Sequence, residues 1–295
     1  MEEKSKVKEI EVLKNFKKQS SKIRIFKMFF FCTILLGVLY FILGINNELE
    51  LSFYSFKSEK IQNNLRFLVI SDLHSSKFGE NNEEILELIA TCNTQVDAVF
   101  LVGDIIDDDP NLDHESTYKF ITEISMKFPS FYVSGNHELY TNDLESIKAK
   151  FLQCGVTILN GDKLSVNIRG NEIDVYGIDD PYYPEFENQL LSLPAVDENK
   201  LSILLAHRPE RFEKYVEHNF DLVFSGHAHG GHFRIPFLEI GIFAPHQGLF
   251  PKYDAGTYSK NATTMILSRG LSKTSTIIPR LYNRPELLIV DVEIA

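Results

Sequence analysis

The chain has 295 residues, enough for one large α/β domain or for a smaller domain with an appendage. Hydrophobic residues make up 44% and charged residues 24%, a balance typical of globular rather than disordered proteins. The formal net charge of −11 argues against a nucleic-acid-binding surface as the main function, because such a surface must be positive. We therefore expect no nucleic acid partner, and the sequence predicts no protein partner.

A basic segment and an uncharged apolar run open the chain. Residues 1–27 carry nine Lys/Arg and four Glu, a balance of +5 that leaves −16 for the remainder. Met28–Ile45 then gives 18 residues without a charge, the lower limit for a membrane-spanning helix. A buried core helix fits poorly beside a basic flank. A cleaved signal peptide is the stronger rival, but Asn46–Leu49 offers no small-residue cleavage site, so we expect an uncleaved anchor.

The nine Lys and Arg residues of 1–27 precede this span, whereas Glu48 and Glu50 follow directly after it. Because the bias in Lys and Arg sets orientation, we expect a cytoplasmic N-terminus and an extracytoplasmic main domain in a single-pass protein of the cell membrane. The alternative is a peripheral protein whose basic tail and apolar helix lie on the cytoplasmic leaflet. The predicted parts are a basic cytoplasmic tail (1–27), a transmembrane anchor (28–45), a juxtamembrane linker with a first strand (46–64) and the main domain (65–295).

From Arg66 onward, short apolar runs alternate with helical or loop stretches, as in an α/β protein. Near-continuous apolar runs indicate strands that are covered on both faces. After a first strand within 48–56, the predicted strands are 67–70, 98–102, 131–133, 173–176, 201–206, 222–225, 265–268 and 287–292. The predicted helices are 82–92, 115–127 and 144–154.

Polar residues follow five of these predicted strands, at the edge where open α/β sheets build their sites. A single Asp-x-His or a lone histidine after a strand is common and usually structural. Five such groups in this order are specific, because chance would have to place them all on converging loops. The groups are Ser71-Asp72-Leu73-His74, Gly103-Asp104-Ile105-Ile106-Asp107, Ser134-Gly135-Asn136-His137-Glu138, Ala206-His207 and Gly226-His227-Ala228-His229-Gly230-Gly231-His232.

These side chains are the ligands of a borderline divalent metal. Carboxylate, imidazole and carboxamide groups together suit Mn, Fe or Zn, and a carboxylate can bridge two ions. Of the three cysteines, Cys32 lies in the apolar run, and Cys92 and Cys154 have no CxxC spacing and are expected to be small buried side chains rather than a zinc site or a disulfide. The sequence has neither a Gly-x-Ser-x-Gly elbow nor a P-loop, so attack by a metal-held hydroxide is the simplest mechanism.

Taken together, the motifs resemble the calcineurin-like metallophosphoesterase superfamily from about Leu65 to the C-terminus. Three further stretches resemble its bacterial membrane-associated branch, the YkuE/YaeI-like phosphoesterases. These stretches are Gly177-Ile178-Asp179-Asp180-Pro181, Ala244-Pro245-His246-Gln247-Gly248 and Asn283-Arg284-Pro285-Glu286-Leu287. The resemblance implies a four-layer αββα sandwich with the site at the strand ends, here joined to an N-terminal transmembrane helix.

The resemblance also implies a role for each motif residue. Two divalent ions (Mn, Zn or Fe) are expected, the first held by Asp72, His74 and His229, the second by Asn136, His207 and His227, with Asp104 bridging them. His137 would act as acid or charge stabiliser beside the phosphate, and Asp107 would orient its ring. Arg208 and His232 depart from the pattern and are candidate substrate contacts. His114 and His218 are expected on the surface, and His246 in a pocket wall.

The implied activity is hydrolysis of a phosphomonoester, phosphodiester or pyrophosphate bond. An anchored site suggests a lipid-linked substrate, with a phosphorylated small molecule such as a nucleotide as the alternative. A membrane-tethered protein that binds metal or phosphate without turnover is a second alternative, which the complete ligand set disfavours.

Overall fold

The computed structural model describes residues 2–91, 95–273 and 280–295 and divides the chain into two compact units, Met1–Ile45 and Asn46–Ala295. The first unit is one continuous helix, α1 (Glu2–Gly44). Its segment Lys17–Gly44 is long and apolar enough to cross a membrane, and none of the apolar stretch is buried. The basic segment and the predicted span are therefore parts of a single helix.

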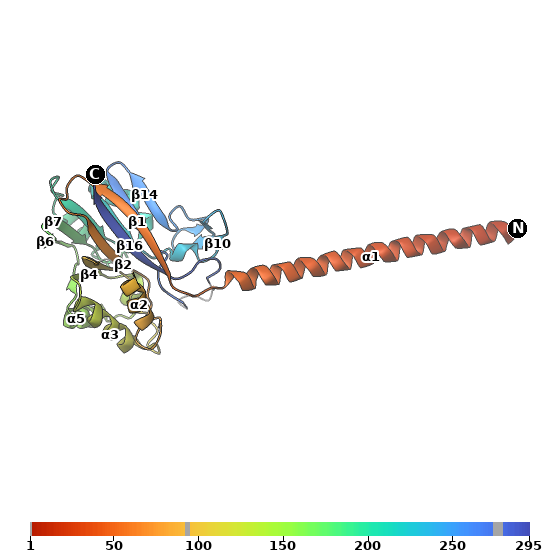
Figure 1. Cartoon of the computed structure of the whole chain (residues 1–295), viewed down its shortest axis with the longest axis horizontal. Helices are drawn as coiled ribbons and strands as arrows, with labels where there is room; N and C mark the ends of the chain where they lie inside the picture. Colours follow the sequence, from red (N-terminus) through yellow and green to blue (C-terminus); the bar gives the residue numbers. More distant parts are fainter. Residues whose placement is uncertain (1, 92–94, 274–279) are drawn as a thin grey trace. The chain divides into compact units, whose positions relative to one another are not determined.

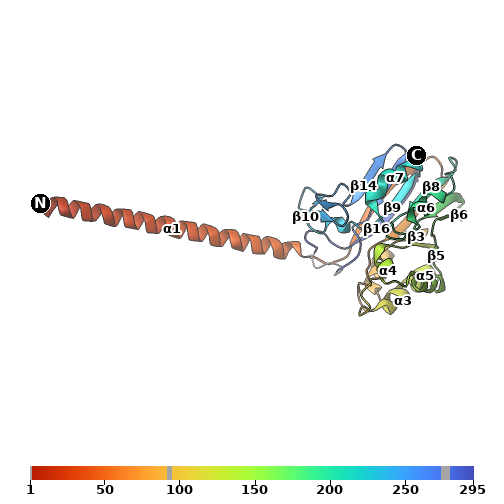
Figure 2. The same cartoon turned by 180° about the vertical axis from the view of Figure 1, so that it is seen from behind.

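The second unit is built on two six-stranded sheets (Figures 1 and 2). The first sheet has the order β1 (Glu50–Ser58), β16 (Glu286–Ile294), β2 (Leu65–Ile70), β3 (Ala98–Val102), β4 (Ser130–Val133), β5 (Thr157–Ile158). The second has the order β14 (Gly256–Lys260), β15 (Thr263–Leu267), β9 (Leu222–Ser225), β8 (Leu201–Leu205), β7 (Asn171–Gly177), β6 (Asp162–Ile168). Two small hairpins, β10 (Arg234–Ile235) with β11 (Ile240–Gly241) and β12 (Phe243–Ala244) with β13 (Gly248–Leu249), follow β9.

Alternating side chains stack these sheets face to face. On β2, Phe67 and Val69 enter the core between the sheets, whereas Leu68 and Ile70 pack outward with α2 (Glu83–Thr91), α3 (His114–Ser125) and α5 (Leu144–Gln153). The outer face of the second sheet packs with α6 (Phe186–Ser192) and α7 (Phe212–Glu217). Because a strand's side chains alternate between faces, each central strand serves two cores. The predicted four-layer αββα sandwich is confirmed.

Most predicted strands lie within two residues of the observed ones, since a buried parallel strand is a nearly continuous apolar run. The sequence prediction missed β6 and β14, which have half-exposed surfaces and mixed composition. It also missed the short helices α6 and α7. The end of the predicted helix 82–92, including Cys92, lies outside the described residues, whereas Cys154 is buried.

The boundary of the main domain lies earlier in the chain than the sequence prediction put it. Strand β1 pairs in parallel with β16 along its whole length, from Glu50 beside Glu286 to Ser58 beside Ile294. It is thus the predicted first strand, and it forms the edge of the first sheet. The compact unit begins at Asn46, not at residue 65.

Candidate active site

The loops after β2, β3, β4, β8 and β9 meet at one edge of the two sheets. Their backbones are bonded to each other: Asp72 N–H donates to the Gly103 carbonyl at 3.0 Å, and His74 N–H donates to the Asp104 carbonyl at 2.9 Å. Parallel neighbouring strands place their carboxyl ends side by side, so motifs far apart in the sequence converge. Six of the seven predicted ligands and His137 lie in this cluster, and the seventh, Asn136, is buried next to His137 in the chain.

The carboxylates of Asp72 and Asp104 form the centre of the cluster. Asp104 Oδ2 lies 3.1 Å from His207 Nε2 and 3.5 Å from His74 Nε2, so it reaches imidazoles of both expected metal sites. Asp72 Oδ1 lies 3.7 Å from His229 Nε2. Asp72, His74 and His229 together could hold one ion, and Asp104, His207 and His227 a second.

Five polar atoms of the predicted site are buried and form no well-aligned hydrogen bond among the described residues, although Asp104 Oδ2 and His207 Nε2 face each other at 3.1 Å. The five atoms are His74 Nε2, Asp104 Oδ2, Asn136 Oδ1, His207 Nε2 and His227 Nδ1. An unsatisfied buried polar atom costs about 1–3 kcal/mol, and natural proteins keep few of them. Five in one place, all of them oxygen or imidazole nitrogen, fit divalent metal ions as the missing partners.

Hydrogen bonds on the far side of each ring decide which nitrogen faces the cluster. We assign a donating Nδ1–H to His74, bonded to Asp107 Oδ2 at 2.8 Å, and to His207, bonded to the Val102 carbonyl at 2.8 Å. Each leaves the Nε2 lone pair free for a metal, as is usual for ligating histidines. His227 is turned the other way, since its Nε2 lies 2.9 Å from His246 Nδ1.

Glu138, which the sequence prediction left without a role, anchors two of the loops. Its fully buried carboxylate accepts four backbone N–H groups: Asp104 at 2.9 Å, Ile105 at 2.6 Å, Ile106 at 3.0 Å and Gly135 at 2.8 Å. Burial and then Asp104 raise the pKa of Glu138 to about 7, while these N–H groups favour the carboxylate. Its place in the Gly-Asn-His-Glu motif was the signal in the sequence.

Several cluster residues adopt strained backbone. Asp72, His74, Asp104, His227 and His229 all have positive φ, between 47° and 69°. A non-glycine residue held there costs about 1–3 kcal/mol, and such residues gather at functional sites. Gly103, at φ 76°, has no room for a side chain because a Cβ would lie 2.6 Å from His207 Nδ1.

The charges in the cluster favour cations. Burial opposes ionisation of Asp104, yet His207 and His74 hold the pKa of its carboxyl well below the usual range. Burial lowers the pKa of the His207 imidazole, but the negative charges of Asp104 and Asp72 have the larger effect and raise that pKa to about 10. Asp104 therefore draws positive charge into a buried site, whereas burial raises the pKa of the neighbouring Asp72.

Residues 65–231 match the calcineurin-like phosphoesterase family over more than half of the chain. The chain belongs to this family. It is 26% identical to the metallophosphoesterase YkuE of Bacillus subtilis over 233 residues, which cover 77% of this chain and 79% of that protein. A metallophosphoesterase of Aquifex aeolicus is 28% identical over 85% of this chain and 97% of its own length. The phosphodiesterase YaeI of Escherichia coli is 24% identical over 77% of this chain and 82% of its own.

These relatives confirm the YkuE/YaeI-like branch, and this phosphoesterase is a hydrolase that acts on phosphoester bonds. The donor set of the cluster fits the divalent metal ions that the family implies. The three stretches that resembled the branch now have structural roles around the cluster. In one of them, Asn283 Nδ2 donates to the His229 carbonyl at 2.7 Å and to the His232 carbonyl at 3.2 Å, which holds the last ligand loop.

His137 of this phosphoesterase has a different partner from the predicted one. Its Nδ1 bonds to Asp108 Oδ1 at 2.5 Å, whereas Asp107 Oδ2 is 3.6 Å away and bonds to His74 instead. The expectation that Asp107 orients His137 is therefore corrected: Asp108 orients that ring, and Asp107 orients His74. The aspartates are adjacent in sequence, and only the loop geometry assigns each to its histidine.

Arg208 is a buried residue rather than an exposed contact. Its Nε and Nη2 form a bidentate pair with Asp180, and its Nη1 lies 3.1 Å from His227 Nε2. Four of its five N–H groups are directed at protein atoms when the contact with Glu210, at 3.3 Å, is included. Asp180 thus holds the guanidinium of Arg208 beside the ring of His227.

The remaining histidines fall into three positions. His232 is buried and stacks on His229 with ring centres 5.1 Å apart, and burial, Arg280 and His74 lower its pKa to about 4. His246 is exposed but touches His227, in agreement with a pocket wall. His114 and His218 are half-buried, and His114 Nδ1 lies 2.7 Å from Ser75 Oγ.

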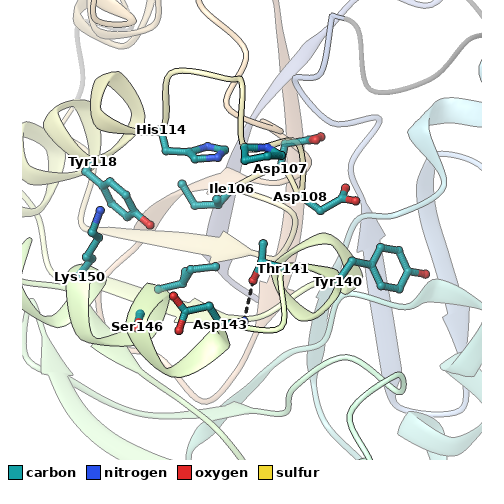
Figure 3. A pocket seen from close by; sticks show the side chains of 12 residues that line it. Ile106, Asp107, Asp108, His114, Tyr118, Tyr140, Thr141, Asp143, Ser146 and Lys150 are labelled. Atoms are coloured by element: carbon teal, nitrogen blue, oxygen red, sulfur yellow. Dashed lines mark hydrogen bonds between the residues drawn. The ribbon is translucent and has the colours of Figure 1, made fainter.

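Two cavities border the cluster. One, of about 400 Å³, is lined by Asp107, Asp108, Tyr140 and Lys150 among others (Figure 3). The other, of about 390 Å³, is lined by Pro181, Tyr182, Arg208, Glu210, Arg211 and His246. The rings of Tyr140 and Tyr182, one from each cavity, meet edge to face at 4.9 Å. Each cavity thus contains side chains that bond directly to a predicted ligand or to His137.

Proposed function

We propose that this protein is a two-metal phosphoesterase anchored in the membrane by α1. Asp72, His74 and His229 would hold one ion, Asn136, His207 and His227 would hold the other, and Asp104 would be shared between them. The observation that carries the proposal is the set of five ligand atoms that are buried at one place without a well-aligned hydrogen bond among the described residues. The complete set disfavours the alternative of an inert metal- or phosphate-binding protein.

The ions, when bound, would activate a water molecule and neutralise the phosphoryl group under attack. The protein's own groups position the reaction. Asp107 and the Val102 carbonyl fix the rings of His74 and His207, while Glu138 holds the loop of the bridging carboxylate. His137 is 22% exposed and lies above the ring of His74, with centres 4.3 Å apart, so it can face a substrate that enters from solvent. It donates a proton or stabilises charge there, and Asp108 sets its tautomer.

The substrate class follows from the surroundings of the cluster. A phosphodiester or a pyrophosphate carries a substituent on each side of the bond, and two cavities border the site. A diester or pyrophosphate is therefore favoured over a monoester. The apolar helix, which would hold the enzyme at a bilayer, favours a lipid-linked substrate over a nucleotide. The domain is proposed to lie outside the cytoplasm, because the nine Lys and Arg residues of 1–27 flank the span on its N-terminal side.

Metal titration of the full-length protein in detergent tests this function. After removal of metal by a chelator, Mn, Zn or Fe is added back while bound metal and hydrolysis of bis(4-nitrophenyl) phosphate are measured together. We expect no activity without metal and full activity at two ions per chain. Activity that survives complete metal removal would refute the mechanism, and saturation at one ion per chain would refute the bridged pair.

The same loaded enzyme distinguishes the substrate classes. We expect a higher kcat/KM for phospholipids or lipid pyrophosphates in mixed micelles than for nucleotide diesters or for 4-nitrophenyl phosphate. A preference for the nucleotide would establish the alternative.

A further inference from the structure

A group of exposed apolar side chains follows the last ligand loop. Of the thirteen large hydrophobic residues exposed in the described part of the Asn46–Ala295 unit, six lie within 237–250. Phe237 is 102% exposed, Leu249 70% and Phe250 66%. We call these six residues the apolar lip: Phe237, Leu238, Ile240, Phe243, Leu249 and Phe250. Scattered exposed apolar residues are normal, whereas a concentration of this kind marks an interaction surface.

The apolar lip is built from the two small hairpins. Phe243 of β12 is the cross-strand partner of Leu249 of β13, so these side chains share a face of their hairpin. The backbone bond from Phe250 N–H to the Ile242 carbonyl at 2.7 Å extends this hairpin by one more pair of residues. Both cartoons show the β10 region well apart from α3 and α5 (Figures 1 and 2).

Its composition differs from that of the rest of the domain. The unit that follows the span carries a balance of −16, yet residues 235–251 contain a single charged residue, Glu239. A protein partner that binds through ion pairs would find only one charged side chain here. An apolar medium fits this surface, and the contact would depend little on salt because few charges take part.

The apolar lip is continuous with the active site. His246, in the turn between β12 and β13, touches the predicted ligand His227 at 2.9 Å. Phe243 stacks on His232 with ring centres 6.2 Å apart, and His232 in turn stacks on His229. A surface that held the hairpins would therefore lie next to the site.

The short connection between α1 and the domain limits how far the apolar lip can move from a membrane that α1 spans. Five residues, 45–49, join the end of α1 to the start of β1. Even fully extended they reach only about 17 Å, at about 3.4 Å per residue. If α1 spans a bilayer, the domain stays at its surface, and the apolar medium at the highest local concentration is lipid.

We propose that the apolar lip is a bilayer-docking surface: the hairpins insert Phe237 and Leu249 between lipid headgroups and hold the phosphoesterase site against the membrane. This inference rests on the proposed membrane anchor and would explain how the site meets a lipid-linked phosphoester without extracting it from the bilayer.

The chain contains no tryptophan, so a single introduced one reports its own surroundings. Phe237→Trp and Leu249→Trp are made in the full-length protein and placed in nanodiscs of phosphatidylcholine, one chain per disc. Leu152→Trp, at an exposed position on α5, is the matched control. Lipids brominated on the acyl chain quench a tryptophan that enters the bilayer.

We expect the brominated lipid to remove at least about half of the emission of the two lip variants, because interfacial insertion reaches about 5–10 Å into the headgroup and acyl boundary. The Leu152→Trp control should be unaffected, and salt should not change the result. Quenching of the lip variants no greater than that of the control overturns the proposal. If the lip tryptophans are protected from solvent only when a disc holds several copies of the chain, the proposal is also overturned, because the surface then mediates self-association.

This readout uses no turnover, so it separates docking from the proposed activity. Insertion without hydrolysis would leave the docking surface intact and refute the enzyme proposal. A second variant, Phe237→Glu with Leu249→Glu, links the two: we expect at least about tenfold slower hydrolysis of a bilayer-embedded phosphodiester and an unchanged rate on soluble bis(4-nitrophenyl) phosphate. Equal loss on both substrates would overturn the docking role.

Discussion

Replacing Glu138 by glutamine should destabilise the site far more than its chemical similarity suggests. The carboxylate accepts two backbone N–H groups on each oxygen, from Ile105 and Ile106 on Oε1 and from Asp104 and Gly135 on Oε2. A glutamine keeps one oxygen and turns an NH2 group toward the other two donors. Two buried bonds to a charged group are lost, at about 1.5–3 kcal/mol each, so we expect a loss of about 3–6 kcal/mol.

Thermal unfolding of the metal-free, full-length protein in detergent measures this change. The near-ultraviolet circular dichroism of the tyrosines reports the folded domain, and its midpoint should fall by at least about 6 °C, at about 2–4 °C per kcal/mol. Glu87→Gln, the same chemical change at an exposed position on α2, is the control and should stay within about 0.5 kcal/mol of wild type. A midpoint for Glu138→Gln equal to that of the control would refute this account of the anchor.

Three further predictions concern chemistry and topology. Asp104→Asn should lower both bound metal and turnover, the latter at least about a hundredfold, and a variant with more than about a tenth of wild-type activity would show that Asp104 is not the bridge. His137→Ala should keep its metal content while the reaction slows about 10²–10⁴-fold; a matching loss of metal would make His137 a ligand. Protease added to intact, wall-stripped cells should cut the domain, and survival of the domain until lysis would reverse the proposed orientation.

The sequence alone predicted the family, through it the four layers, and a set of candidate ligands. A parallel strand buried on both faces is a nearly continuous apolar run, so the bounds of strands such as β3 can be read directly from the chain. Because ligands follow the carboxyl ends of those strands, Asp72, Asp104 and His207 stand out in the sequence. The uncharged run before Asn46 likewise needs no tertiary information.

Only the tertiary structure shows where each side chain points and which residues it contacts. Asp107 and Asp108 are adjacent in the chain, and only the fold of their loop gives one to His74 and the other to His137. Arg208 directly follows the predicted ligand His207 in the chain. Only the fold shows that its side chain is buried, paired with Asp180 and next to the ring of His227. In the sequence, the residues of the apolar lip look like those of any buried core segment. Whether an apolar side chain is packed or exposed is set by partners far along the chain, which no local pattern contains.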